Sequence, residues 1–256
     1  MKGYRILIIS CGEFSGIRTS IVNALRNQGC KVIEARYSLK QLRFRPLYIF
    51  LMLANSIVLY RTSFRKYLYH TPIANWAFSK ARHAITSQHK NIDAVISMPR
   101  IGGTYYGKKI PGVRYAILTD HVNLLSKQLP DFGVYMPERG VSPSWNEIER
   151  IALSQQDQVF VLGNFVKKSL VDDYKIDPQN VTVIGAGPNL DVDAERVGIT
   201  KDFSQQNILF VGLEPERKGL PVLKRAFKKV VNVFPRATLG YIRISQPLNC
   251  SDLAVS

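Results

Sequence analysis

The apolar residues of this chain alternate between two spacings over residues 4–185. Short runs rich in Val and Ile are typical of buried strands, and longer stretches with one apolar side are typical of helices. The strand-like runs lie at 4–10, 31–35, 93–98, 113–119, 158–163 and 180–185. The helical stretches lie at 16–29, 73–89, 144–155 and 164–174. This alternation predicts an α/β fold, in which helices cover both faces of a parallel sheet.

The same alternation starts again near the C-terminus. Residues 186–206 are rich in Gly, Pro, Asp and Asn, which favour loops. A strand, a helix and a candidate strand follow, at 207–212, 219–234 and 237–244. We therefore expect a complete N-terminal domain at 1–190, a linker at 191–206 and the beginning of a second domain at 207–256.

Positive charge is concentrated in the first third of the chain. The 256 residues carry 35 Lys and Arg against 19 Asp and Glu, which gives a net charge of +16. Residues 1–90 contain 15 of these cations and only two acids, Glu13 and Glu34. Such a basic segment attracts an anionic partner, unless it is only a solvated basic face. A nucleic-acid-binding protein is the weaker interpretation, because the sequence shows no helix-turn-helix spacing, zinc knuckle or RNP-like strand.

An apolar stretch lies inside this basic region. Residues 47–60 are apolar apart from Asn55 and Ser56, and Arg and Lys flank them within 43–70. As a helix this stretch is about 21 Å long, which is too short to span a bilayer core of about 30 Å. Two interpretations stay open: a buried core helix, or an element that docks on an anionic membrane surface.

The cysteines and the N-terminus both indicate a cytoplasmic protein. Cys11, Cys30 and Cys250 are odd in number and lack metal-ligand or CxxC spacing, which fits reduced thiols. The chain starts almost at once with a strand, so we expect no signal peptide. If residues 43–70 dock on a membrane, the location would be peripheral, on the inner face of the plasma membrane.

The segment "VTVIGAGPNLDVD" contains part of a dinucleotide-binding fingerprint. That fingerprint needs G-x-G-x-x-G before a helix, whose N-terminus holds the pyrophosphate. Gly185 and Gly187 are present, but Leu190 occupies the third position and no apolar helical stripe follows. We therefore exclude flavin or nicotinamide binding here and interpret the segment as a glycine-rich exit from a strand at a domain boundary.

The segment "NILFVGLEPERKGLPVLKRAF" predicts an anion site. A buried strand ends at Gly212, and Arg217, Lys218 and Gly219 stand at the start of an apolar-sided helix. A helix N-terminus offers free N–H groups and a positive dipole end, so cations placed there favour an anionic ligand. Arg supplies a planar fork and Lys a point charge for a diphosphate. The alternative is a pair of solvated surface cations.

Two segments together resemble the retaining glycosyltransferases of family four, whose GT-B fold has two facing Rossmann-like domains. In many relatives "FVG", then "E-R-K-G" and an apolar helix ending in "AF" recur, as in "FVGLEPERKGLPVLKRAF". Upstream, "VKKSLVDDYKIDPQNVTVIGAGPNLD" is similar to the segment that closes the first domain. The resemblance covers residues 140–234 by motif and 1–140 by architecture. It implies a GT-B type fold with one complete Rossmann-like domain and the start of a second.

This resemblance implies transfer of a sugar from a UDP- or GDP-linked donor to an acceptor hydroxyl, with retention and usually without a metal or other cofactor. The acceptor would be a saccharide or a lipid-linked molecule in cell-envelope polysaccharide or glycolipid synthesis. By match, Arg217 and Lys218 would hold the donor diphosphate, and Gly212 and Gly219 would let the backbone approach it. Cations preorganised in a closed cleft stabilise the charge that develops on such a leaving group.

Further residues would line the cleft by the same match. Gly185, Gly187 and Asn189 would lie on the side opposite the diphosphate. In the first domain, "CGEFSGI" follows the first strand where the family places a glycine-rich loop, so Gly12 and Gly16 are candidates. A simple turn between strand and helix explains these two glycines equally well.

Asp120 and His121 are the candidate catalytic residues. They follow a strand in "LTDHVN", so we expect them at the carboxyl edge of the sheet, where many relatives carry a functional Asp or His. A helix-capping Asp beside a structural His is the alternative interpretation.

The chain departs from the family pattern in two places. Gly163 in "VLGNFV" stands where relatives commonly carry a Ser, which puts one phosphate or acceptor contact in doubt. The second domain also lacks the paired-glutamate motif that contacts the donor sugar, and ends after one strand–helix unit and a candidate strand. We therefore expect a truncated transferase with weak or absent activity, or a non-catalytic partner subunit that keeps the acceptor side.

Overall fold

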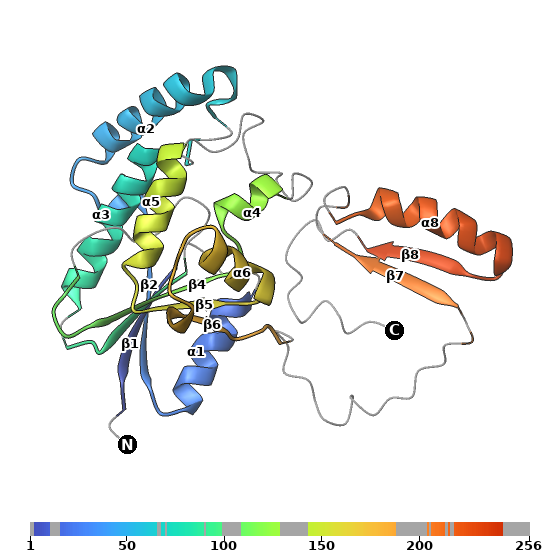
Figure 1. Ribbon diagram of the computed structural model, residues 1–256, viewed down its shortest axis with the longest axis horizontal. Helices are drawn as coiled ribbons and strands as arrows, with labels where there is room; N and C mark the ends of the chain where they lie inside the picture. Colours follow the sequence, from blue (N-terminus) through green and yellow to red (C-terminus); the bar gives the residue numbers. More distant parts are fainter. Residues whose placement is uncertain are drawn as a thin grey trace. The chain divides into compact units, whose positions relative to one another are not determined.

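The computed structural model divides the chain into two units, Met1–Leu190 and Asp191–Ser256, and we describe each by itself (Figure 1). Its described residues are 3–10, 16–65, 68–69, 71–89, 91–98, 109–128, 143–187, 204, 206–212, 215 and 218–242. Gly12, Asn189 and Arg217, which the sequence marks as candidate site residues, lie outside them.

Unit 1 is built on a six-stranded sheet in the order β2-β1-β3-β4-β5-β6, in which every neighbouring pair is parallel. The strands are β1 Arg5–Ser10, β2 Lys31–Arg36, β3 Ala94–Met98, β4 Arg114–Thr119, β5 Gln158–Val161 and β6 Val181–Val183. The α-helices are α1 Ile17–Asn27, α2 Arg45–Tyr60, α3 Pro72–Gln88, α4 Asn123–Gln128, α5 Pro143–Ser154 and α6 Asn164–Asp172. Short 3₁₀ turns lie at η2 Leu39–Gln41, η3 Arg61–Ser63 and η5 Pro178–Asn180. The prediction of an α/β fold with a Rossmann-like parallel sheet is confirmed.

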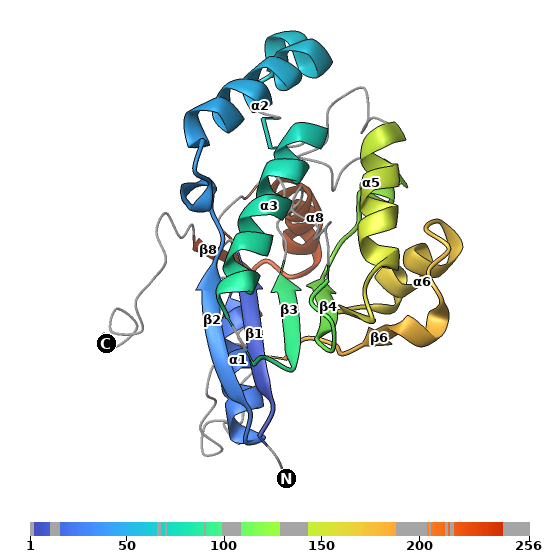
Figure 2. The same ribbon diagram turned by 90° about the vertical axis from the view of Figure 1, so that its left-hand side faces the viewer.

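The central strands are apolar on both of their sides because both faces of the sheet are covered. On one face, Leu7, Val95 and Tyr115 are neighbours across three strands and pack under α3 (Figure 2). Farther along that face, α5 and α6 cover β4 and β5. On the opposite face, Ile8 packs with Val22 of α1. The alternation of side chains along each strand therefore supplies both layers of the core.

Helix α2 is apolar on all sides, but the described residues of unit 1 cover only one of them. Met52 is buried against Ala74 and Ala77 of α3, with an exposed fraction of 1%. On the other side Phe50 and Val58 are 66% and 76% exposed. The core-helix interpretation therefore describes the inner side of α2 alone. Within the described residues, no helix combines the length and the apolarity that crossing a membrane requires.

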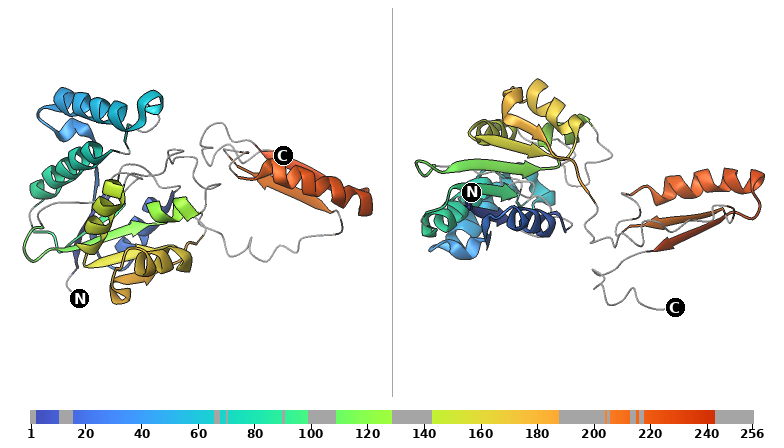
Figure 3. Two further views of the ribbon diagram at one scale, coloured as in Figure 1. Left: turned by 45° about the horizontal axis from the view of Figure 1, so that its top comes forward. Right: turned by 90° about the horizontal axis from the view of Figure 1, so that it is seen from below.

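Unit 2 contains the strand–helix–strand arrangement that the sequence predicts. Strands β7 Asn207–Val211 and β8 Thr238–Ile242 pair in parallel, and α8 Leu220–Val233 lies along one side of them (Figure 3). In α8 only Leu220 is buried, whereas Leu209 and Tyr241 are more than half exposed. Two strands and one helix bury little apolar surface, which explains why these side chains stay open to solvent.

Candidate functional site

The strand order of unit 1 reverses between β1 and β3, which makes this position a topological switch point of the sheet. In open parallel sheets, ligands bind outside the carboxyl ends of the strands at such a switch point. Ser10 ends β1 there; it is fully buried, and its hydroxyl has no hydrogen-bond partner among the described residues. The sequence analysis did not identify Ser10, because a Ser at the end of an apolar strand is an ordinary residue.

Gly16 stands on the other side of the loop that follows β1. It is the N-cap of α1, where its φ of 83° places it in the left-handed region that a glycine adopts without strain. No side chain caps this helix. The backbone conformation therefore explains the glycine by itself, and its contact with a ligand stays a prediction.

Asp120 and His121 directly follow β4, at the carboxyl edge of the sheet. Asp120 is exposed and His121 is half-buried. The Thr119 hydroxyl donates a hydrogen bond to the His121 carbonyl oxygen over 2.6 Å, which fixes the turn between them. Burial lowers the pKa of His121, and the nearby negative charge of Asp120 opposes this shift. The imidazole is therefore predominantly neutral at neutral pH and can accept a hydrogen bond from a sugar hydroxyl.

A half-buried acidic residue holds the next turn of this loop. Glu149 of α5 accepts a hydrogen bond from the backbone N–H of Asn123 over 3.0 Å and another from the Tyr174 hydroxyl. The Tyr174 oxygen in turn accepts the N–H of Leu124 over 3.1 Å. Loss of water around the Glu149 carboxylate raises its pKa to about 7, although these hydrogen bonds oppose the shift. Sequence reasoning missed Glu149, since it reads as an ordinary acid on an amphipathic helix.

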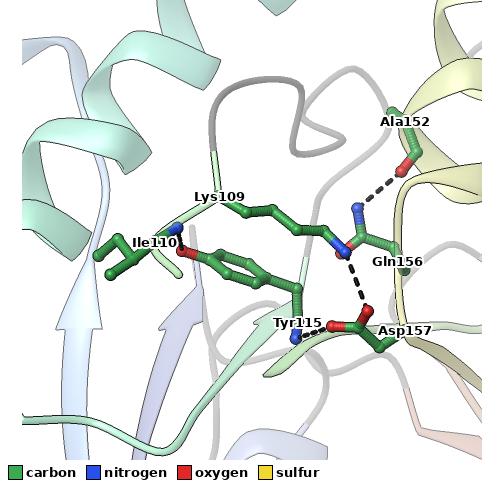
Figure 4. Close-up of polar contacts among 6 residues, drawn as sticks. All are labelled: Lys109, Ile110, Tyr115, Ala152, Gln156 and Asp157. Atoms are coloured by element: carbon green, nitrogen blue, oxygen red, sulfur yellow. Dashed lines mark hydrogen bonds and ion pairs between the residues drawn. The ribbon is translucent and has the colours of Figure 1, made fainter. Parts of the chain in front are cut away.

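A second polar network lies at the opposite, amino edge of the sheet (Figure 4). Asp157 accepts the N–H of Tyr115 over 2.7 Å and the Lys109 ammonium over 3.0 Å. Partial burial opposes the charged form of Asp157, but these two donors outweigh it and lower its pKa. The network joins the starts of β4 and β5, so it stabilises the sheet on the edge away from Asp120 and His121.

The glycine-rich exit from β6 contains two different glycines. Gly185 has a φ of 71°, so its backbone conformation favours glycine. Gly187 has no such requirement, and a Cβ atom added at either position would meet nothing within 4 Å. Neither packing nor backbone conformation therefore accounts for Gly187, which keeps it a candidate for contact with a ligand.

In unit 2, the structure brings together three of the residues predicted to form the diphosphate site. A Cβ atom added to Gly212 would lie 3.4 Å from Cγ of Lys218, so the exposed lysine runs along the bare backbone at the end of β7. Gly219 is the N-cap of α8 with a φ of 83° and no side-chain cap. These three residues therefore form one corner between β7 and α8.

The N-terminus of α8 offers fewer donors than the sequence analysis assumed. The N–H of Leu220 donates to the Pro215 carbonyl oxygen over 2.8 Å, and Pro221 has no N–H. The expectation of a helix end rich in free N–H groups is therefore wrong for these two positions. An anion at this corner depends mainly on side-chain cations such as Lys218.

A hollow of about 270 Å³ lies at the carboxyl ends of β7 and β8. The residues that line it are Phe210, Gly212, Pro215, Leu220, Pro221, Lys224, Tyr241 and Ile242. The ammonium of Lys224 lies 4.7 Å from the centre of the Tyr241 ring and brings a positive charge to a mostly apolar wall. The sequence analysis missed Lys224, although it lies one helical turn beyond Leu220 and hence on the same side of α8.

Among the described residues, no three His, Cys, Asp or Glu side chains come together in a way that could hold a metal ion.

The sequence matches no protein-family model and no curated protein. Solved structures with a similar chain path include a glycosyltransferase from Rickettsia africae at 14% identity and a TM-score of 0.38. The match covers 96% of this chain and 69% of the glycosyltransferase chain. A UDP-N-acetylglucosamine 2-epimerase from Rickettsia bellii is similar at 10% identity with a TM-score of 0.46, and the match covers 95% of this chain and 62% of the epimerase chain. The glycotransferase of kitacinnamycin is similar at 11% identity with a TM-score of 0.49, and the match covers 99% of this chain and 68% of the glycotransferase chain. The chain thus spans about two thirds of the length of these structures.

The fold and the residues at the carboxyl end of β4 define the class of the protein. It is an α/β protein with a Rossmann-like parallel sheet, and in unit 1 Asp120 and His121 follow the carboxyl end of β4. Its particular activity is a proposal and rests on its own residues, because all three TM-scores lie below 0.5.

Proposed function

We propose that this chain is a glycosyltransferase that binds a UDP- or GDP-linked sugar and transfers the sugar to an acceptor hydroxyl, with retention at the anomeric carbon. The observation that carries the proposal is the corner where Lys218 lies against Gly212, beside the hollow at the ends of β7 and β8. A glycine there lets a ligand approach the backbone, and the lysine supplies the charge that a diphosphate requires.

In the proposed reaction, this corner would bind the leaving group. Breaking the bond between sugar and phosphate leaves a nucleoside diphosphate with additional negative charge, which a nearby cation stabilises. Lys218 would supply that charge, together with Arg217, its neighbour in the sequence "ERKG". Lys224 is a further cation beside the same hollow.

Unit 1 would bind the acceptor. Asp120 and His121 follow β4 at the edge where parallel sheets bind ligands, and Glu149 fixes the loop that follows them. A neutral His121 can accept a hydrogen bond from an acceptor hydroxyl, and Asp120 adds a negative charge to the same turn. The acceptor would be a saccharide or a lipid-linked molecule of cell-envelope polysaccharide or glycolipid synthesis.

Calorimetry tests the donor site directly. We would titrate UDP-glucose, UDP-N-acetylglucosamine and GDP-mannose into the full chain and into its Lys218→Ala variant. A charge-assisted contact of about 1.5 to 3 kcal/mol predicts roughly ten- to hundredfold weaker binding by the variant. Lys229→Ala is the matched control, because Lys229 is exposed on the same helix, far from its N-terminus. The proposal fails if no nucleotide sugar binds, or if both variants bind equally.

The apolar side chains that unit 2 exposes favour a second candidate, a subunit that acts with a partner polypeptide. Leu209, Val211 and Tyr241 are 63%, 53% and 55% exposed on the two strands. Under this alternative the chain binds a donor through Lys218 but transfers no sugar alone. Mass spectrometry of products, with a panel of saccharide and glycolipid acceptors, separates the two: release of a glycosylated acceptor by the chain alone excludes the subunit.

A further inference from the structure

Helix α2 presents a continuous apolar stripe to solvent. Leu47, Phe50, Ile57 and Val58 recur at helical spacing, and each is about half exposed or more, between 48% and 76%. Their opposite side is the one that packs on α3 through Met52. A helix that is apolar all round is normally enclosed, so its outer side requires a cover that the described residues of unit 1 do not supply.

Cations stand at both ends of this stripe. Arg43 and Arg45 precede it, and Arg61 and Arg65 follow it; all four are exposed. In the described part of the chain, none of the four forms an ion pair with a carboxylate. Across residues 35–92 the chain has ten Lys and Arg and no Asp or Glu. The cover of α2 must therefore tolerate positive charge at both ends of an apolar stripe about 18 Å long.

An aromatic pair extends the stripe toward α3. The rings of Tyr48 and Trp76 lie 5.1 Å apart, and Trp76 is 43% exposed. The ammonium of Lys80 lies 5.1 Å from the centre of the Trp76 ring. Tryptophan and tyrosine with a neighbouring cation are typical of side chains that lie at the level of lipid headgroups.

We propose that the outer side of α2 docks on an anionic lipid bilayer, with its apolar stripe among the acyl chains and its arginines among the headgroup phosphates. A helix that lies in the plane of the membrane buries one apolar side in this way. The negative surface of such a bilayer attracts arginines near it, which accounts for four exposed cations without acidic partners.

A second copy of the chain is a poorer cover for the same surface. In a symmetric dimer the same patch meets itself, so the arginines of one copy would face those of the other. No acid between residues 35 and 92 is available to neutralise them. Like charges brought together oppose association, whereas a layer of phosphates favours it.

The docked orientation also suits unit 1. The strands of the sheet point toward the end of the unit where α2 lies, and Asp120 and His121 follow a strand at that same end (Figure 2). A lipid-linked acceptor at the membrane surface would then be close to the proposed acceptor site. The docking itself does not depend on sugar transfer, because it rests on α2 and α3 alone.

Vesicle flotation with the full chain tests the proposal. We expect the protein to float with vesicles that contain phosphatidylglycerol and to stay at the bottom with vesicles of phosphatidylcholine alone. Binding should weaken as salt is added, because the headgroup attraction is screened. The double variant Phe50→Ser/Val58→Ser should lose at least about tenfold in the bound fraction, since two exposed apolar side chains no longer enter the bilayer.

Each arm of the experiment has a matched control. Phe165→Ser removes a 58% exposed aromatic from α6, and Lys31→Gln removes an exposed cation at the start of β2. Both should float like the unchanged chain, whereas Arg43→Gln/Arg65→Gln should bind several-fold less. Circular dichroism confirms that every variant is folded.

Three outcomes overturn the proposal. The first is a chain that floats with neither kind of vesicle. The second is an equal loss in Phe165→Ser and in Phe50→Ser/Val58→Ser. The third is light scattering that shows a dimer of the unchanged chain and a monomer of Phe50→Ser/Val58→Ser, without vesicle binding, because this result assigns the stripe to a second copy. Calorimetry of nucleotide sugars does not depend on any of these three outcomes. A failure of the docking proposal therefore leaves the proposed sugar transfer untouched.

Discussion

The hydroxyl of Tyr174 donates a hydrogen bond to the Glu149 carboxylate, and its oxygen accepts the N–H of Leu124. This contact joins the residues that follow α6 to α5 and to the start of α4. Burial and the charge of Glu149 both raise the pKa of Tyr174, so the phenol keeps its proton and stays a donor. The loop that carries Asp120 and His121 is therefore anchored by two side chains from elsewhere in the fold.

Replacing Glu149 should change how stability depends on pH. Its pKa in the folded chain is about 7, above the ordinary value of 4.5, so the folded state binds the proton more tightly than the unfolded chain does. The stabilising contribution is complete below about pH 4.5 and is lost as the pH rises through about 7, with a total of up to roughly 3 kcal/mol. Glu149→Gln should flatten this part of the pH profile.

Urea unfolding at a series of pH values measures this effect. Glu147→Gln is the control, because Glu147 is exposed on the same helix and pairs with Arg150. Its stability profile should keep the slope of the unchanged chain. A slope in Glu149→Gln as steep as in that control would contradict the assignment.

Removing the hydroxyl of Tyr174 should destabilise the chain. Tyr174→Phe leaves the Leu124 N–H without its acceptor and removes one donor to Glu149, which costs about 1 to 3 kcal/mol. Because the two side chains touch, the double variant with Glu149→Gln should lose less than the sum of the single losses. Denaturant titration of the four proteins gives the coupling, and strict additivity would show that the network does not act as a unit.

Two glycines of the β6 exit should respond differently to substitution. Gly185→Ala places a side chain at a φ of 71°, with a cost of about 1 kcal/mol. Gly187→Ala meets open space and should leave the unfolding midpoint unchanged. If Gly187 contacts the donor, its alanine variant should instead bind a nucleotide sugar several-fold more weakly in calorimetry. Unchanged binding would remove Gly187 from the site.

Gly163 offers a prediction about helix capping. It is the N-cap of α6, in an extended conformation with no side-chain cap. A Cβ atom there would come within 2.8 Å of the Phe165 ring, which is the mobile end of an exposed side chain and can turn away. Gly163→Ser should therefore be about 1 kcal/mol more stable than Gly163→Ala, because only the serine caps the helix. Thermal unfolding compares the two, and equal midpoints would show that the hydroxyl does not reach the helix N–H groups.

The spacing of apolar residues was sufficient to predict the sheet. The run at 113–119 became β4 because both its faces are buried, and the run at 158–163 lost only its end, where Gly163 caps a helix. Local spacing records burial, which is why the strands were found. It does not record the partner, so the apolar side of α2 that remains open could not be distinguished from the side that packs on α3.

Only those residues of the candidate site that directly follow a strand in the sequence could be predicted. Asp120 and His121 could be placed because the end of a parallel strand fixes the edge at which they lie. Glu149 could not, since its partners Asn123 and Tyr174 are 26 and 25 residues away and only the folded chain brings them together. The assignment of Arg217 and Lys218 to a diphosphate and of Gly12 and Asn189 to the cleft stays a prediction.

The first turn of α8 has a consequence for how tightly a charged ligand is held. With the Leu220 amide already bonded and a proline next to it, no rigid backbone cradle awaits an incoming phosphate at these positions. Under the proposed function, the attraction for a diphosphate would therefore come mainly from the long side chain of Lys218. The attraction between an exposed ammonium and a phosphate weakens as ionic strength rises. The nucleotide affinity measured in dilute buffer would therefore exceed the affinity at the ionic strength of the cell.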